Sequence, residues 1–185
     1  MPDGLPGRRA GEDPPGGAAR RVLVVGLGNP LMADDGVGIA VAERLLSLEV
    51  PAGARVEVGD TDSLRLLSLW KGEEEIWLVD AILRDTQPGT VHRMSHDEVL
   101  SIPQRHAAAH FLSLPESLRW IAAATPDMAR VRYRLWGIEP ESIALSPGLT
   151  PRVAAAAEAV AAEIAGELGH VLVRTIDGGT APGGE

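Results

Sequence analysis

Two short segments of this chain carry no charged or polar side chain, and they restrict its fold more than any other feature. Residues 22–27 read VLVVGL and residues 76–79 read IWLV. A strand that is apolar on both faces needs cover on both faces, which is typical of a parallel sheet between two layers of helices. Residues 37–48, which follow the first segment closely, repeat apolar side chains at helical spacing. The chain is therefore expected to adopt an α/β fold.

Strands and helices continue to alternate along the rest of the chain. We expect strands at residues 56–58, 90–94 and 131–136, and helices at residues 64–70, 113–124 and 151–168. Ser113 and Glu116 form the pattern of a capping box, and Thr150 is placed to cap the last helix. These elements predict a three-layer αβα domain over residues 20–176, with a mostly parallel sheet and helices on both faces.

The two ends of the chain differ in composition from this domain. Residues 1–19 are rich in Pro and Gly and nearly free of bulky apolar side chains, and residues 177–185 are similar. Ordering such segments costs conformational entropy that no burial offsets. We expect a flexible N-terminal tail and a flexible C-terminal tail.

The composition argues against several classes of function. Hydrophobic residues make up 45% of the chain and aromatic residues only 3%, so the core must be mainly aliphatic. A formal net charge of -9 argues against a nucleic-acid partner, because it repels the phosphate backbone. The chain has no cysteine, so a metal site must use His, Asp or Glu. No apolar run approaches the roughly 20 residues that span a bilayer, and we expect a cytoplasmic protein without a membrane partner.

Acidic side chains follow two of the expected strands. Asp34 and Asp35 lie in the loop after the first strand, and Asp80 follows residues 76–79 directly. The carboxyl ends of parallel strands usually carry the functional loops of such folds. One acid of the Asp34–Asp35 pair is expected to be structural, because a carboxylate just before a helix can cap exposed amides. An acid at the position of Asp80 is costly unless it is solvated, paired or bound to a ligand.

The glycine-containing loop at Gly26 and Gly28 does not match a nucleotide-binding motif. A dinucleotide fingerprint needs a third glycine where this chain has Leu31, and no Gly-Lys-Ser/Thr sequence follows. The glycines are therefore interpreted as a tight turn from strand to helix.

Five histidines are available as further ligands, namely His92, His96, His106, His110 and His170. Their positions alone do not choose among them. Two carboxylates with one imidazole would suit a borderline divalent ion such as nickel or zinc.

Three blocks of the sequence resemble the hydrogenase maturation endopeptidases, a family that shares its fold with the spore germination protease. They read VLVVGLGNPLMADDGVGIAVAERL, WLVDAI and GIEPESIALSPGLTPRV, and the resemblance spans about residues 21–170. It implies an endopeptidase that removes the C-terminal extension of the nickel-iron hydrogenase large-subunit precursor after nickel insertion. It also implies that nickel is supplied by the precursor, without a tightly bound resident cofactor.

The resemblance assigns catalytic and metal-contacting roles to Asp35, Asp80 and His110. The family's histidine is followed by Leu at four and eight positions, often with an acid at six, and His110 fits this with Leu114, Glu116 and Leu118. His106 matches less well. Either a carboxylate or a metal-activated water could start the attack on the peptide bond.

One departure from the family pattern keeps other functions open. The family usually has Asp-Gly-Gly-Thr after the second strand, whereas Asp60 is followed here by Thr61 and Asp62. One alternative is a chaperone that binds the precursor in a nickel-dependent way without cutting it. Another is peptidyl-tRNA hydrolase, which shares Val-Gly-Leu-Gly-Asn-Pro, but its downstream Arg-His-Asn is absent at residues 34–36.

Overall fold

A five-stranded sheet forms the centre of the protein, in a computed structural model that describes residues 21–102 and 113–177. The strand order is β2-β1-β3-β5-β4. The strands are β1 (Val22–Gly26), β2 (Ala54–Val58), β3 (Glu75–Ala81), β4 (Val91–Met94) and β5 (Arg132–Ile138). The first four strands in this order run parallel, and β4 runs antiparallel along β5. The predicted mostly parallel sheet is confirmed.

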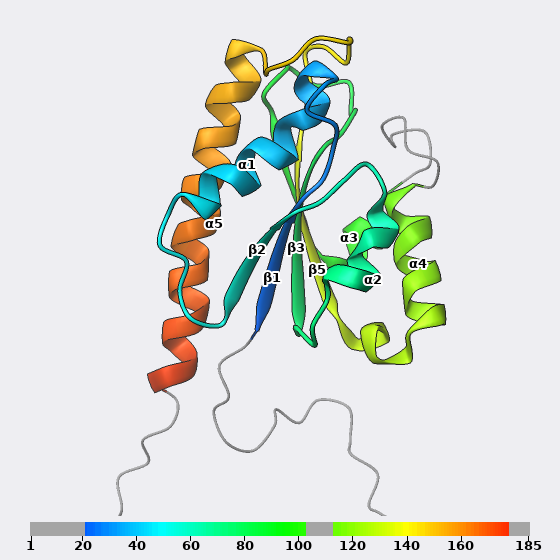
Figure 1. Cartoon of the computed structure of the whole chain (residues 1–185), viewed down its shortest axis with the longest axis vertical. Helices are drawn as coiled ribbons and strands as arrows, with labels where there is room; N and C mark the ends of the chain where they lie inside the picture. Colours follow the sequence, from blue (N-terminus) through cyan, green and yellow to red (C-terminus); the bar gives the residue numbers. More distant parts are fainter. Residues whose placement is uncertain (1–20, 103–112, 178–185) are drawn as a thin grey trace, which may run out of the picture.

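Helices cover both faces of this sheet (Figure 1). One face carries α1 (Val37–Leu46) and α5 (Pro151–Asp177), and the other carries α2 (Leu66–Leu69), α3 (His96–Leu100) and α4 (Leu114–Ala124). Short 3-10 turns occur at η1 (Ala33–Gly36), η2 (Ser63–Arg65) and η4 (Pro126–Arg130). The predicted three-layer αβα architecture is confirmed. Within the described part of the chain, no helix has the length and apolar character needed to cross a membrane.

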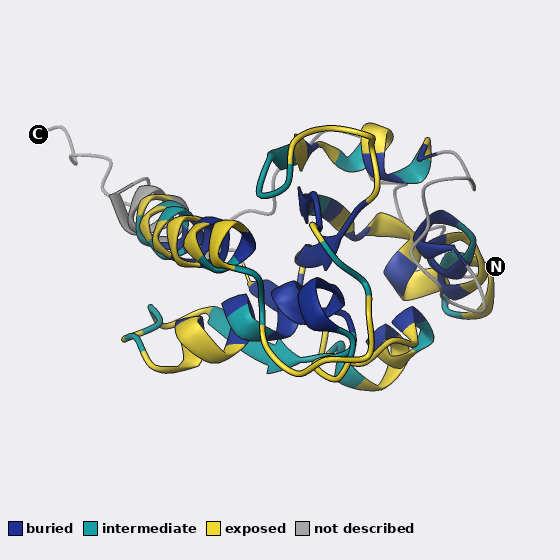
Figure 2. Ribbon diagram, turned by 90° about the horizontal axis from the view of Figure 1, so that it is seen from above, coloured by how far each residue is buried: buried dark blue, intermediate teal, exposed yellow. Residues whose placement is uncertain are grey.

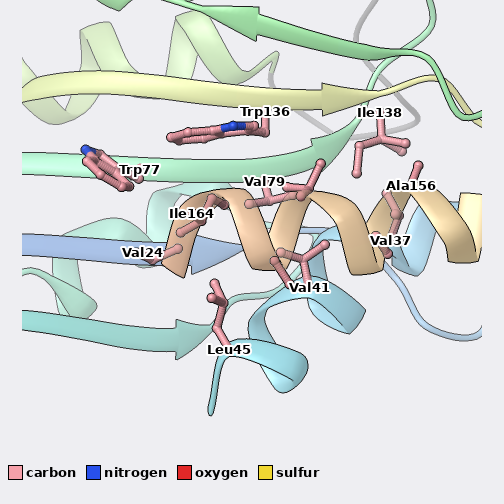
Figure 3. Packing of buried hydrophobic residues seen from close by; sticks show 14 of the residues in the cluster. Val24, Val37, Val41, Leu45, Trp77, Val79, Trp136, Ile138, Ala156 and Ile164 are labelled. Atoms are coloured by element: carbon pink, nitrogen blue, oxygen red, sulfur yellow. The ribbon is translucent and has the colours of Figure 1, made fainter. Parts of the chain in front are cut away.

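The two faces of the sheet bury separate sets of side chains. Val24 and Val79 pack in one layer with Val41 of α1 and Ile164 of α5 (Figure 3). Leu23, the neighbour of Val24 along β1, belongs to the other hydrophobic cluster. Each aliphatic side chain that is fully buried in this way contributes roughly 1.5–3 kcal/mol. Figure 2 shows the result, with buried strands at the centre and exposed residues on the outer side of α5.

Glycine allows α1 to approach the backbone of the sheet. A Cβ atom on Gly38 would lie 2.1 Å from the carbonyl oxygen of Val79 and 2.3 Å from that of Leu27. A Cβ atom on Gly26 would lie 1.9 Å from the carbonyl oxygen of Gly38. Any larger residue at these positions would push α1 away from β1 and β3. The close contact places the start of α1 directly at the carboxyl edge of the sheet.

Some element boundaries differ from the sequence prediction near the centre of the chain. β3 includes Asp80, which pairs in register with Gly137 of β5 instead of following the strand. Helix α3 is not predicted, because five residues are too few to show helical periodicity. It begins with a capping box, in which the backbone N–H and Oγ of Ser95 donate to Glu98 Oε2 at 2.8 and 2.6 Å.

The last helix is longer than predicted. α5 runs to Asp177, whereas the sequence prediction ends the helix at residue 168 and places His170 beyond it. Within the helix, His170 Nδ1 lies 2.7 Å from the carbonyl oxygen of Gly166. Glycine in a helix interior costs only about 1 kcal/mol relative to alanine, so α5 continues through Gly169. The predicted tails lie outside the described residues, except for Asp177.

Candidate active site

Four buried acids gather at the carboxyl edge of the sheet, at the upper end of the molecule in Figure 1. β1 and β3 are neighbours with Gly26 opposite Val79, and β5 lies on the other side of β3. The loops that leave these strands therefore meet at one place, where functional groups of parallel sheets usually lie. The four acids are Asp34, Asp35, Asp80 and Glu139.

Asp34 is a structural acid, but it does not cap a helix as predicted. Its side chain is fully buried, and neither η1 nor α1 has a side-chain cap. Instead, Asp34 Oδ2 accepts bonds from the backbone N–H groups of Glu141 and Ser142 at 2.9 and 3.0 Å. Thr150 donates its backbone N–H to Oδ1 at 2.7 Å and its hydroxyl to Oδ2 at 3.0 Å. Asp34 therefore joins the loop before α1 to the loop after β5.

Asp35 is held by the tight glycine turn that precedes it. Its Oδ2 accepts a bond from the backbone N–H of Asn29 at 3.0 Å. Gly28 has φ of 125°, and a Cβ atom there would lie 1.8 Å from the carbonyl oxygen of Asp35. Ala33 has φ of 46°, in the left-handed region that residues other than glycine rarely adopt. The predicted turn is confirmed, and it holds a side chain that is 5% exposed at the edge of the sheet.

Asp80 has a strongly perturbed titration. Its side chain is 6% exposed, and its Oδ1 accepts a bond from the backbone N–H of Ala81 at 2.9 Å. Burial, and after it the negative charge of Asp35, raise the pKa of Asp80 to about 8, although the bond from Ala81 acts in the opposite direction. A carboxyl group of this kind holds its proton at neutral pH. The two acids predicted from the sequence are therefore close enough to interact.

His110, the third predicted residue, lies outside the described residues. The helix that follows accounts for part of the pattern that singled it out. Leu114 and Leu118 are 8% and 1% exposed, and Glu116 Oε2 accepts the backbone N–H of Ser113 at 3.0 Å. Among the residues with described positions, no three His, Cys, Asp or Glu side chains are grouped to hold a metal ion. The metal-contacting role of the histidine stays a prediction.

Glu139 belongs to this edge and was missed by sequence reasoning. It is 3% exposed, and its carboxylate accepts the backbone N–H of Arg84 at 3.1 Å on Oε1 and 2.9 Å on Oε2. The Thr86 hydroxyl donates to Oε2 at 2.9 Å, and His92 Nε2 lies 3.5 Å from the same oxygen. Its sequence signal is weaker than that of Asp80, because the strand before it carries Arg132 and Arg134 and only its last four residues, LWGI, are wholly apolar.

The turn at residues 60–62, where the sequence departs from the family pattern, has a structural role. The backbone N–H of Thr61 donates to Asp60 Oδ1 at 2.7 Å, and this bond lowers the pKa of Asp60. Asp62 Oδ1 accepts the backbone N–H of Leu64 at 2.9 Å, which caps η2. A glycine pair could not provide the second carboxylate. The turn is therefore the ordered start of a helical segment.

Known proteins resemble this chain over most of its length. A family model described as hydrogenase maturation protease matches residues 39–167. The hydrogenase 2 maturation protease of Escherichia coli K12 is 29% identical over 140 residues, which cover 75% of this chain and 84% of that protein.

Two solved structures agree with this assignment. A [NiFe] hydrogenase maturation protease from Thermococcus kodakarensis superposes with a TM-score of 0.69 at 34% identity, covering 80% of this chain and 98% of that one. A hydrogenase maturating endopeptidase from E. coli gives a TM-score of 0.70 at 27% identity, covering 81% and 93%. The sequence blocks, the fold and these matches together show that the chain belongs to the hydrogenase maturation protease family.

Proposed function

We propose that this protein is an endopeptidase that removes the C-terminal extension from a nickel-iron hydrogenase large-subunit precursor after nickel insertion. Family membership supports this activity. The observation that carries the proposal is the buried pair Asp35 and Asp80, in which burial and the second acid raise the pKa of Asp80 to about 8. Such perturbed acids at a loop-bearing edge are typical of functional sites.

In this proposal nickel arrives as part of the substrate. Asp35, Asp80 and His110 would contact it, because carboxylate and imidazole groups are suitable ligands for a borderline divalent ion. A cation beside Asp35 and Asp80 would offset their mutual repulsion, so its binding would release the proton held by Asp80. At neutral pH that proton competes with free metal, which supports a protein without a tightly held resident ion.

The proposed chemistry depends on holding one peptide bond beside the two acids. Nickel bound in the precursor would fix the adjacent peptide bond near Asp35 and Asp80 and so reduce the entropic cost of attack. Two routes then lead to hydrolysis, with the attacking water activated either by a carboxylate or by the metal. In the first route, a carboxylate that the cation leaves ionised would accept a proton from water and return it to the leaving amine.

The proposal is tested by intact-mass spectrometry of the large-subunit precursor after incubation with the protein. Nickel-loaded precursor should lose a C-terminal fragment, and nickel-free precursor should stay intact. Asp35→Asn, Asp80→Asn and His110→Ala should abolish the cut. Asp127→Asn is a matched control, because this exposed acid lies in η4, far from the carboxyl edge, and it should cut as the wild type does.

Other results of the same experiment would select a different function. A loaded precursor that is bound tightly but not cut would indicate a nickel-dependent chaperone. An unloaded precursor that is cut equally well would contradict recognition through nickel. Hydrolysis of peptidyl-tRNA would support the esterase alternative, although a chain with a net charge of -9 is poorly suited to tRNA.

A further inference from the structure

A short segment after β5 contacts the loops of both acids in the proposed site. Residues 139–142, here called the bridging segment, leave the end of β5 at the carboxyl edge. One end of the segment contacts the loop that follows Asp80, and the other end contacts the loop that carries Asp35. In Figure 1 this part of the chain lies at the top of the molecule, beside the loop that follows β3.

The first end is anchored through Glu139. In addition to its carboxylate bonds with Arg84 and Thr86, its backbone N–H donates to the carbonyl oxygen of Thr90 at 2.9 Å. Its own carbonyl oxygen accepts the backbone N–H of Gly89 at 2.8 Å. Side chain and backbone of one residue therefore hold residues 84–90, and this stretch begins four residues after Asp80.

The second end is anchored through Asp34. Its carboxylate accepts the backbone N–H groups of Glu141 and Ser142, and its own backbone N–H donates to the carbonyl oxygen of Ser142 at 3.1 Å. Asp34 is the immediate neighbour of Asp35. Any shift of the bridging segment would therefore be passed to the backbone of Asp35.

We propose that the bridging segment sets the separation of Asp35 and Asp80, with Asp34 and Glu139 as positioning residues. The hydrogen bonds to the side chains of Asp34 and Glu139 come from backbone amides and hydroxyls. Hydrogen bonds to a carboxylate are stronger than those between neutral groups. Pro140 restricts the backbone between the two anchors. The kinetic consequence rests on the proposed peptidase function, whereas the mechanical coupling does not.

The kinetic test compares Glu139→Gln and Asp34→Asn with the wild type in cleavage of nickel-loaded precursor. A displacement of the reacting groups of about 1 Å can cost on the order of 100-fold, so we expect kcat to fall roughly 10- to 100-fold with little change in KM. The double variant should lose no more than about twofold beyond the worse single variant, because both residues act through one segment. Additive losses would contradict a shared route.

Glu73→Gln is the matched control. Glu73 is also a buried acid, with bonds of 2.6 Å from Arg55 Nη1 and from the backbone N–H of Lys71, but it lies before β3 at the opposite edge of the sheet. The Glu73→Gln variant should have a lower free energy of unfolding than the wild type, but its kcat should stay within about twofold of the wild-type value. An equal loss of kcat in this control would show that general destabilisation, and not positioning, explains the effect.

The coupling is tested separately by amide hydrogen exchange, which needs no substrate. In Glu139→Gln, the amides of Glu141, Ser142 and Thr150 should exchange at least about fivefold faster relative to amides of β1. In Asp34→Asn, the amides of Arg84 and Gly89 should respond likewise. Unchanged exchange at these distant amides would overturn the inference. If the wild type cuts no precursor, the proposed function fails, and the exchange ratios alone decide whether the segment couples the two loops.

Discussion

Buried acids lie at both edges of the central sheet, and they differ in what surrounds their charge. At the amino edge, Glu73 is 2% exposed and accepts a bond of 2.6 Å from the Arg55 guanidinium group. At the carboxyl edge, Asp80 is 6% exposed, and burial together with the charge of Asp35 raises its pKa to about 8. One acid has a cation as its partner, whereas the other has a second acid as its neighbour.

This difference separates structural acids from candidates for function. A buried carboxylate that is paired with a guanidinium group is compensated, and removing its partner costs stability. A buried carboxyl group with a raised pKa costs stability in its charged form. A buried acid with a raised pKa at a loop-bearing edge is typical of a functional site.

The largest expected effect concerns activity. Asp35→Asn and Asp80→Asn should each lower kcat/KM for nickel-loaded precursor by about 1,000-fold or more, because each removes a group that would contact the reacting centre. Glu73→Gln should change it by less than about threefold. The check is the initial rate of fragment release by mass spectrometry. Similar losses at both edges would remove the functional distinction between them.

The next effect concerns stability and its pH dependence. The pKa of Asp80 is raised in the folded state from 3.8 to about 8, so the folded protein binds more protons than the unfolded chain between these values. The free energy of unfolding should therefore fall as pH rises through this window, by up to about 1.4 kcal/mol per pH unit from this group. Asp80→Asn should remove that slope and stabilise the protein at pH 7 by roughly 2–4 kcal/mol. Urea denaturation at several pH values measures both, and an unchanged slope would contradict the raised pKa.

Glu73→Gln should have the opposite sign at the other edge. The variant keeps the shape of the side chain but leaves the Arg55 guanidinium group without its buried counter-charge. We expect a loss of roughly 1–3 kcal/mol at pH 7, measured by urea denaturation. A gain in stability would show that the buried charge of Glu73 is no better compensated than that of Asp80.

The smallest effect is expected for an exposed acid at the carboxyl edge. Asp60 has a side chain that is 52% exposed and lies 3.4 Å from Arg65 Nη1. Because water screens such a pair, Asp60→Asn should change the free energy of unfolding by less than about 1 kcal/mol. Thermal denaturation at low and high salt would check this. A change as large as that in Asp80→Asn would mean that position at this edge matters more than burial.

Local sequence patterns predicted much of the fold and part of the site. The apolar segments at residues 22–27 and 76–79 form the adjacent central strands β1 and β3. Because parallel strands end at the same edge, the acids at the carboxyl ends of these two strands had to lie near each other, and the effect of Asp35 on Asp80 confirms this proximity. The roles of Asp35, Asp80 and His110 in catalysis and in nickel contact stay predictions.

The sequence by itself determined the layers, the mostly parallel character of the sheet and the edge at which Asp35 and Asp80 meet, because periodicity and turn residues act over a few neighbouring positions. Only the tertiary structure decided what Asp34 and Glu139 do. Asp34 bonds to residues 107 to 116 positions away, and Glu139 accepts an amide 55 positions away. Such bonds depend on how distant loops pack against each other, and no local pattern records which buried donors will face a given carboxylate.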